Sequence, residues 1–77
     1  MELSYDPRYN IAYIRLREKT TEVETICISD ELNVDISPDG KIYGIELLNA
    51  NDQLEIAKGK GLLFTDESTG KTVRLPI

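Results

Sequence analysis

The sequence contains no histidine, and its only cysteine is Cys27. A single cysteine cannot close a disulfide within the chain, and without histidine or a second thiol a structural zinc site lacks its usual ligands. Acid–base catalysis near neutral pH would need a carboxyl or amino group with a displaced pKa, since histidine is the side chain that ordinarily titrates there. We therefore expect neither an enzymatic activity nor a bound cofactor or metal.

Basic residues are also scarce, because 9 Lys and Arg stand against 14 Asp and Glu, which gives a net charge of −5. This balance argues against direct binding to nucleic acid or to an anionic membrane, and it is compatible with a basic protein partner. The sequence has no apolar run near the roughly 18 residues of a membrane span, and its N-terminus does not resemble a signal peptide. Together with the lone cysteine, these features predict a cytoplasmic protein.

A chain of 77 residues predicts a single domain, residues 1–77, with a small core. A domain of this size buries only about 60% of the surface that its unfolded chain exposes. Small domains usually gain stability from disulfides, a metal or self-association. Since the first two are missing here, we expect self-association, most simply as a homodimer.

Two segments with high β-propensity, residues 11–17 and 22–28, are separated by the loop at 18–21. Antiparallel pairing of the two segments places opposite charges together and apolar residues together, so the sequence predicts a hairpin. Both faces of this hairpin would carry apolar side chains and would need to be covered. On one face lie the residues that we predict as interface candidates: Ile11, Tyr13, Ile26 and Ile28.

The lone cysteine falls on the other face of this predicted hairpin. There Cys27 would lie opposite Ala12. Free cysteine is among the most frequently buried residue types and packs as a small hydrophobic side chain. We therefore expect Cys27 to be a buried core residue and not a nucleophile.

A second hairpin is predicted from residues 32–36 and 41–47, and its register is left open. A two-residue turn at Asp39-Gly40 would pair Val34 with Ile45 and align apolar residues on one face. Pro38 instead favours a type I turn followed by a left-handed Gly40, which shifts the pairing by one residue.

The rest of the chain predicts one helix and one further hairpin. Residues 49–57 lose the strand alternation and favour a short helix, and residues 62–75 are typical of a C-terminal hairpin. The sequence as a whole therefore predicts an α+β fold, an antiparallel β-meander of about five to seven short strands with one short helix near residues 49–57.

Residues 35–46 match the calcium-loop pattern except that Ser37 replaces the second acidic position. Asp35, Asp39 and Glu46 would supply the carboxylates. The pattern requires a helix on each side, whereas the flanking residues alternate as strands do. The tip of a β-hairpin explains the same residues, so cation binding is kept only as an alternative function.

Three segments carry a resemblance to a known family: Leu3–Pro7, Ala12–Leu16 and Asp39–Leu47. Over residues 2–55 the chain resembles the YuzE-like family of small prokaryotic domains of unknown function. The resemblance implies a β-meander packed with a helix, and the family usually has an acidic residue where this chain has Asn10. Some relatives are similar to acidic partners of small basic toxin-like proteins, which implies a related role here.

These observations lead to three functional hypotheses. The first is a small acidic protein-interaction module, antitoxin-like in binding a basic protein. The second is a homo-oligomeric structural or ligand-binding domain. The third is a divalent-cation-binding domain that uses Asp35, Asp39 and Glu46.

Overall fold

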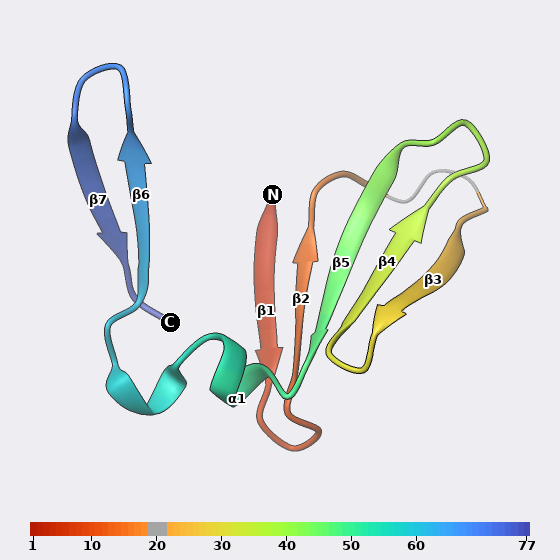
Figure 1. Cartoon of the computed structure of the whole chain (residues 1–77), viewed down its shortest axis with the longest axis horizontal. Coiled ribbons are helices and arrows are strands. Elements are labelled where there is room, and N and C mark those ends of the chain that lie inside the picture. The colour runs from red at the N-terminus through yellow and green to blue at the C-terminus, as the bar shows by residue number, and fades with distance from the viewer. Residues whose placement is uncertain (19–21) are drawn as a thin grey trace.

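The structure, a computed structural model, describes residues 1–18 and 22–77. It confirms a small α+β fold built mainly from antiparallel strands with one short helix (Figure 1). The elements are β1 (Glu2–Asp6), β2 (Ile11–Arg15), β3 (Glu24–Ser29), β4 (Leu32–Ile36), β5 (Ile42–Leu48), α1 (Ala50–Gln53), the 3-10 helix η1 (Ile56–Lys58), β6 (Leu62–Asp66) and β7 (Lys71–Leu75).

The first five strands form one antiparallel sheet in the order β1-β2-β5-β4-β3. Strands β3, β4 and β5 are a three-stranded meander, and the β1–β2 hairpin adds to its β5 edge (Figure 1). The chain therefore passes from β2 to the opposite edge of the sheet before β3 begins. The predicted loop at 18–21 belongs to this connection, and its residues 19–21 lie outside the described residues.

The predicted hairpin between residues 11–17 and 22–28 is wrong, because β5 and β4 lie between β2 and β3. The matching of apolar and charged residues that predicts this hairpin is also satisfied by other strand pairs. Ile14 of β2 pairs with Leu3 on one side and with Ile45 on the other. When several strands alternate apolar and polar residues in the same way, cross-strand matching cannot select the partner strand.

The second predicted hairpin is present as β4 and β5, and each of the two predicted registers holds in part of it. In the strand body Val34 pairs with Ile45, as the apolar pattern requires. The register shifts by one residue after Asp35. At the turn, the Gly40 amide donates to the Ser37 carbonyl oxygen at 2.9 Å, and Gly40 is left-handed with φ 88°. A β-bulge reconciles the turn geometry with the apolar pairing.

One face of the five-stranded sheet is apolar. Paired residues on neighbouring strands point to the same face, and this face carries two rows of such residues, one across all five strands and one beside it. We call it the apolar face; its rows are Leu3, Ile14, Ile45, Val34 and Ile26, and Tyr5, Ala12, Leu47 and Leu32.

The opposite face is mainly polar, which corrects the expectation of a sheet that is apolar on both sides. We call it the polar face; its main rows are Ser4, Tyr13, Glu46, Asn33 and Cys27, and Glu2, Arg15, Gly44, Asp35 and Thr25, and a shorter third row holds Asp6 with the apolar Ile11 and Leu48. The prediction of a buried Cys27 is also wrong. Its thiol is exposed, lies opposite Asn33 and donates to the Ser29 carbonyl oxygen at 3.3 Å.

The helical segment is anchored to the sheet by Asn10, in the turn between β1 and β2. The Asn10 carbonyl oxygen accepts from the Ala50 amide at 3.0 Å, and its side-chain Oδ1 accepts from the Asn51 amide at 2.7 Å. Two amides of the first turn of α1 thus find acceptors outside the helix. The predicted helix over 49–57 is divided into α1 and η1, because Glu55 between them is left-handed with φ 51°.

The predicted C-terminal hairpin is present as β6 and β7, which we call the arm (residues 62–75). It pairs only with itself and stands beside the five-stranded sheet (Figure 1). Among the described residues, the buried apolar side chains are Ala12, Tyr43 and Ala50. The core of a single copy is therefore very small.

Candidate functional site

The chain exposes more surface than a compact monomer of its mass. Its accessible surface is 5963 Å², whereas about 4,700 Å² is typical of a folded monomer of 8.7 kDa. Its radius of gyration is 14.1 Å, compared with about 11.5 Å for a compact domain of this length. About 1,200 Å² of surface is thus left uncovered relative to ordinary monomers.

Much of the exposed apolar surface lies on two elements. The first is the apolar face of the sheet, where even the central residues Ile14, Val34 and Ile45 are only half-buried. The second is one face of the arm, where register pairs Leu62 with Leu75 and Phe64 with Val73; all four of these residues are exposed.

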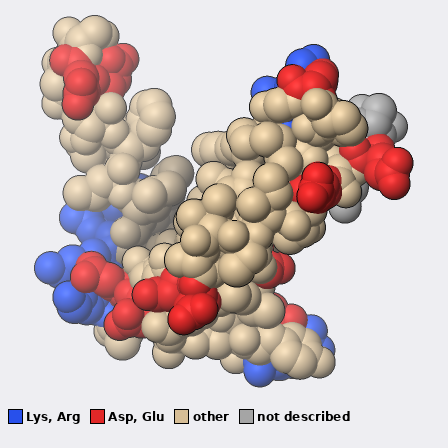
Figure 2. Space-filling model, turned by 45° about the vertical axis from the view of Figure 1, so that its right-hand side comes forward, with Lys and Arg blue, Asp and Glu red and all other residues tan. Residues whose placement is uncertain are grey.

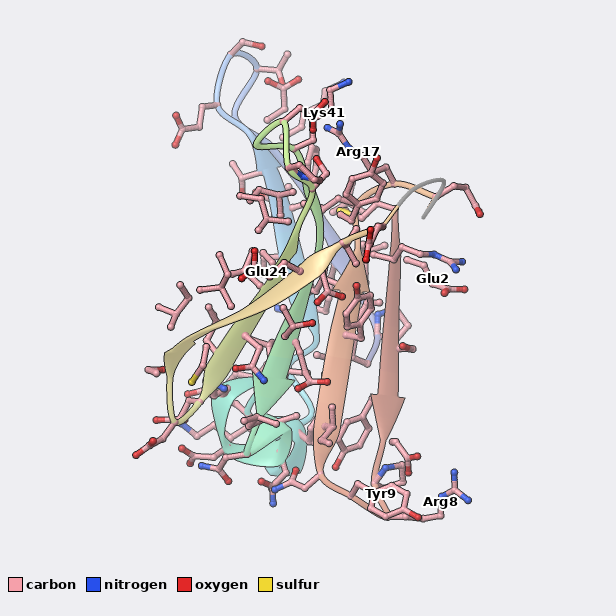
Figure 3. All side chains as sticks on the ribbon, turned by 90° about the vertical axis from the view of Figure 1, so that its right-hand side faces the viewer. Glu2, Arg8, Tyr9, Arg17, Glu24 and Lys41 are labelled. Carbon is pink, nitrogen blue, oxygen red and sulfur yellow. The ribbon has the colours of Figure 1, made fainter. Side chains whose placement is uncertain are left out.

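The two apolar surfaces border one groove. It has a volume of about 500 Å³ and lies between the apolar face, the helical segment and the base of the arm. Its lining includes Leu3, Tyr5, Ile14, Leu54, Leu62 and Leu75. Figure 2 shows the cleft that separates the arm from the rest of the molecule, and in Figure 3 the arm lies behind the sheet, on the side away from the polar face.

Two left-handed glycines set the direction of the arm where it leaves η1. Gly59 has φ 62° and Gly61 has φ 69°, a conformation that other residues adopt only with strain. A Cβ on Gly61 would also overlap the carbonyl oxygen of Leu75. The Arg74 guanidinium donates to the Lys60 carbonyl oxygen and ties the two ends of the arm together. The segment 59–61 therefore joins η1 to the arm in a conformation that favours glycine.

The predicted interface residues are not brought together. Ile11 and Tyr13 are half-buried and point to the polar face. Ile26 is on the apolar face and is 40% exposed, and Ile28, beside the bulge of β3, is 62% exposed. Of the four, Ile26 belongs to the uncovered apolar face. The exposed arm residues are not among the predicted interface residues, although the apolar run at residues 62–64 and the alternation at residues 72–75 carry that signal.

The polar face holds a short hydrogen-bond network that links three strands. The Tyr13 hydroxyl donates to Asp35 Oδ2 at 2.7 Å, and the Thr25 hydroxyl donates to Asp35 Oδ1 at 2.6 Å. Burial, followed by the bond to the Asp35 carboxylate, raises the pKa of Tyr13 to about 12. The network keeps Tyr13 protonated and joins β2, β4 and β3.

The carboxylates of the calcium-like pattern are engaged separately. Asp35 accepts from Tyr13 and Thr25, Glu46 accepts from the Asn33 amide at 2.9 Å, and Asp39 accepts from the Ser37 hydroxyl. The Ser37 hydroxyl bond lowers the pKa of Asp39. Within residues 1–18 and 22–77, no group of three or more His, Cys, Asp or Glu side chains is placed to hold a metal ion.

Comparison with known proteins places the chain in a family without giving it an activity. No helix in the described part of the chain is long and apolar enough to cross a membrane. No curated protein and no solved structure matches the chain. One family model matches residues 2–51, which is more than half of the chain. The match ends inside α1, so η1 and the arm lie beyond it. The family is described as "Protein of unknown function (DUF2283)", and the protein belongs to this family.

Proposed function

We propose that the protein is a protein-interaction module whose first partner is a second copy of itself. The observation that carries the proposal is the uncovered surface of about 1,200 Å² relative to compact monomers. A standard protein–protein interface covers about 800 Å² on each partner, and interfaces of permanent homodimers are larger and more apolar. The amount and the apolar character of the exposed surface both fit a homodimer.

A second copy is a suitable occupant because a two-fold interface uses the same patch twice. The chain has few other means of covering the apolar face, since α1 and η1 together contain seven residues. The proposal describes a binding module and not an enzyme. The absence of histidine from the sequence is in keeping with that choice.

The solution mass tests the proposal. Multi-angle light scattering should give twice the chain mass of 8.7 kDa at micromolar concentration. Ile26→Asp puts a charge on the apolar face at an exposed site, so it should weaken the dimer at least tenfold without unfolding the chain. Cys27→Asp, on the polar face of the same strand, is the matched control and should leave the mass unchanged. A wild-type monomer at 100 μM would contradict the proposal.

A second candidate, binding of a basic protein, is favoured by the charge at the β3 edge of the sheet. No Lys or Arg occurs between Glu22 and Gly40, and β3 is an edge strand that is exposed along its whole length. Edge strands offer unpaired backbone groups to an added strand. The resemblance to the YuzE-like family and to acidic partners of basic toxin-like proteins supports the same role, which we propose as antitoxin-like.

The test of this second role uses a synthetic extended peptide in which Lys and Val alternate. Calorimetric titration should detect binding that weakens as salt is raised. Glu24→Lys should abolish binding, because Glu24 lies on β3 itself. Glu55→Lys changes the net charge equally but lies in the helical segment, so it should have little effect. Equal losses for both variants would indicate attraction to net charge only.

A further inference from the structure

We infer that the two copies exchange arms, so that the arm of each copy packs against the apolar face of its partner. The inference rests on the proposed homodimer and goes beyond it, since it names the segment that occupies the apolar face. Three features of the molecule lead to it, and they concern the arm, the arm's own sheet and the groove.

The first feature is that the arm is a lone hairpin whose apolar side chains lie mainly on one face. A two-stranded hairpin in water is marginal at best unless a neighbour covers its apolar face. Leu62, Phe64, Val73 and Leu75 lie on the same face of the arm. On the opposite face the Thr65 and Thr72 hydroxyls are hydrogen-bonded to each other at 2.8 Å. That opposite face also carries Leu63, which pairs with Arg74, so the face with four apolar side chains is the one that most needs a partner surface.

The second feature is that the arm's own sheet does not supply this surface. At the base of the arm Leu62 and Leu75 are 45% and 46% exposed, and toward the tip Val73 and Phe64 are 55% and 64% exposed. Exposure thus rises along the arm, as expected if the arm diverges from its own sheet. The cleft in Figure 2 shows this divergence.

The third feature is the match between the groove and a second arm. The groove is bordered by apolar residues of the sheet on one side and of the arm on the other. Two β-sheets pack face to face about 10 Å apart, so the apolar side of a second arm can lie as a packed layer directly on the apolar face. The charged pair Asp66 and Lys71 lies at the tip of the arm. The four apolar residues can therefore be buried without burying a charge.

A two-fold axis makes the two insertions equivalent, so one symmetric contact covers both apolar faces and both arms. Exchange of an identical element between copies costs little, because the contacts are of the same kind as those that a closed monomer would make.

Disulfide trapping between two distinguishable copies tests the exchange. One copy carries Phe64→Cys and the other, with an added tag, carries Val34→Cys, each in a Cys27→Ser background. After the copies are refolded together and oxidised, we expect a mixed disulfide as the main product, because Val34 is on the apolar face. Tagged wild type mixed with the Phe64→Cys copy is the control. Its only thiol, Cys27, is on the polar face, and it should trap at least tenfold less.

Each other outcome overturns the exchange. Disulfides only between two Phe64→Cys copies would mean that the arms meet each other. A single chain carrying both cysteines that closes within itself, and stays monomeric, would mean that the arm folds onto its own sheet. If light scattering shows a dimer and no mixed disulfide forms, the exchange is wrong and the homodimer stands. If light scattering shows a monomer, both proposals fail.

Discussion

The phenol ring of Tyr13 crosses over Gly44 to place its hydroxyl 2.7 Å from Asp35. Tyr13 is on β2 and Asp35 is on β4, so the bond spans the intervening strand β5. It is possible only because Gly44 has no Cβ, since a Cβ there would overlap the ring. A glycine in the interior of a strand weakens the strand. Gly44 is nevertheless suited to β5, because the Tyr13 ring lies where a Cβ would be.

Gly44→Ala should displace the Tyr13 ring and break its bond to Asp35. We expect a loss of about 1–2 kcal/mol in the free energy of unfolding, the cost of a partly buried hydrogen bond. Chemical denaturation measures this loss. In a Tyr13→Ala background the same Gly44→Ala change should be nearly neutral, because the ring is absent. Equal costs in both backgrounds would show that the two residues do not interact.

The raised pKa of Tyr13 predicts a stability change at alkaline pH. Tyrosine in the unfolded chain has a pKa near 10, whereas in the fold it is about 12. Between these values the unfolded chain binds fewer protons, so the free energy of unfolding falls as pH rises. Denaturation of the wild type and of Tyr13→Phe from pH 8 to 12 measures it. The wild type should lose more stability than Tyr13→Phe above pH 10; parallel curves would contradict the assignment.

Local features of this fold could be predicted from the sequence, and the partners of its strands could not. The turn at Pro38 and Gly40 and the arm around residues 66–70 carry their own turn residues, so their hairpins were identified. The wrong pairing of residues 11–17 with 22–28 arose because Ile14 finds equivalent apolar partners in several strands. Strand order depends on connections of the whole chain, which alternation does not encode.

The sequence predicts that the protein exposes an apolar β-surface, but it does not identify most of the residues that form this surface. Excess apolar β-surface was expected, and the structure has it. Because the expected face depended on the wrong hairpin, Ile11 and Tyr13 were grouped with Ile26 although they lie on opposite faces. The sequence does not identify the arm as an exposed surface, because apolar residues on one side of a hairpin are ordinarily packed against the rest of the same chain. Only the structure shows that its own sheet leaves Phe64 exposed.

Asn10 is predicted to be a structural anchor of α1. Its φ is 56°, in the left-handed region, and its side chain accepts from the Asn51 amide. Asn10→Ala should lower the free energy of unfolding by about 2 kcal/mol, through loss of the cap and strain in the backbone. Asn10→Gly loses the cap without the strain and should cost less. If the Ala variant is as stable as the Gly variant, the left-handed backbone at residue 10 does not strain alanine.

The same geometry predicts the effect of an acidic residue at position 10. A carboxylate can accept from the Asn51 backbone amide as the Asn10 side chain does, but it cannot donate to Asn51 Oδ1, as Asn10 Nδ2 does at 2.8 Å. Asn10→Asp should therefore keep part of the stability that Asn10→Ala loses. Thermal denaturation of both variants tests this, and a loss in Asn10→Asp as large as that in Asn10→Ala would show that the accepted bond contributes little.

The arm offers the sharpest single-residue test of association. Phe64→Asp places a charge at the centre of the apolar side of the arm, where the side chain is 64% exposed in a single copy. A compact monomer would tolerate this change, whereas a dimer that buries Phe64 should dissociate at least a hundredfold more readily, because a carboxylate cannot be buried without a partner. Sedimentation equilibrium measures the dissociation constant.

The control for this test is Thr65→Asp, one residue along the same strand and on the opposite face of the arm. It adds the same charge at nearly the same place and should leave the dimer intact. Far-ultraviolet circular dichroism of both variants checks that the loss of the dimer is measured on folded chains. If Phe64→Asp and Thr65→Asp weaken the dimer equally, charge repulsion between acidic chains accounts for the loss, and the apolar side of the arm is not the buried surface.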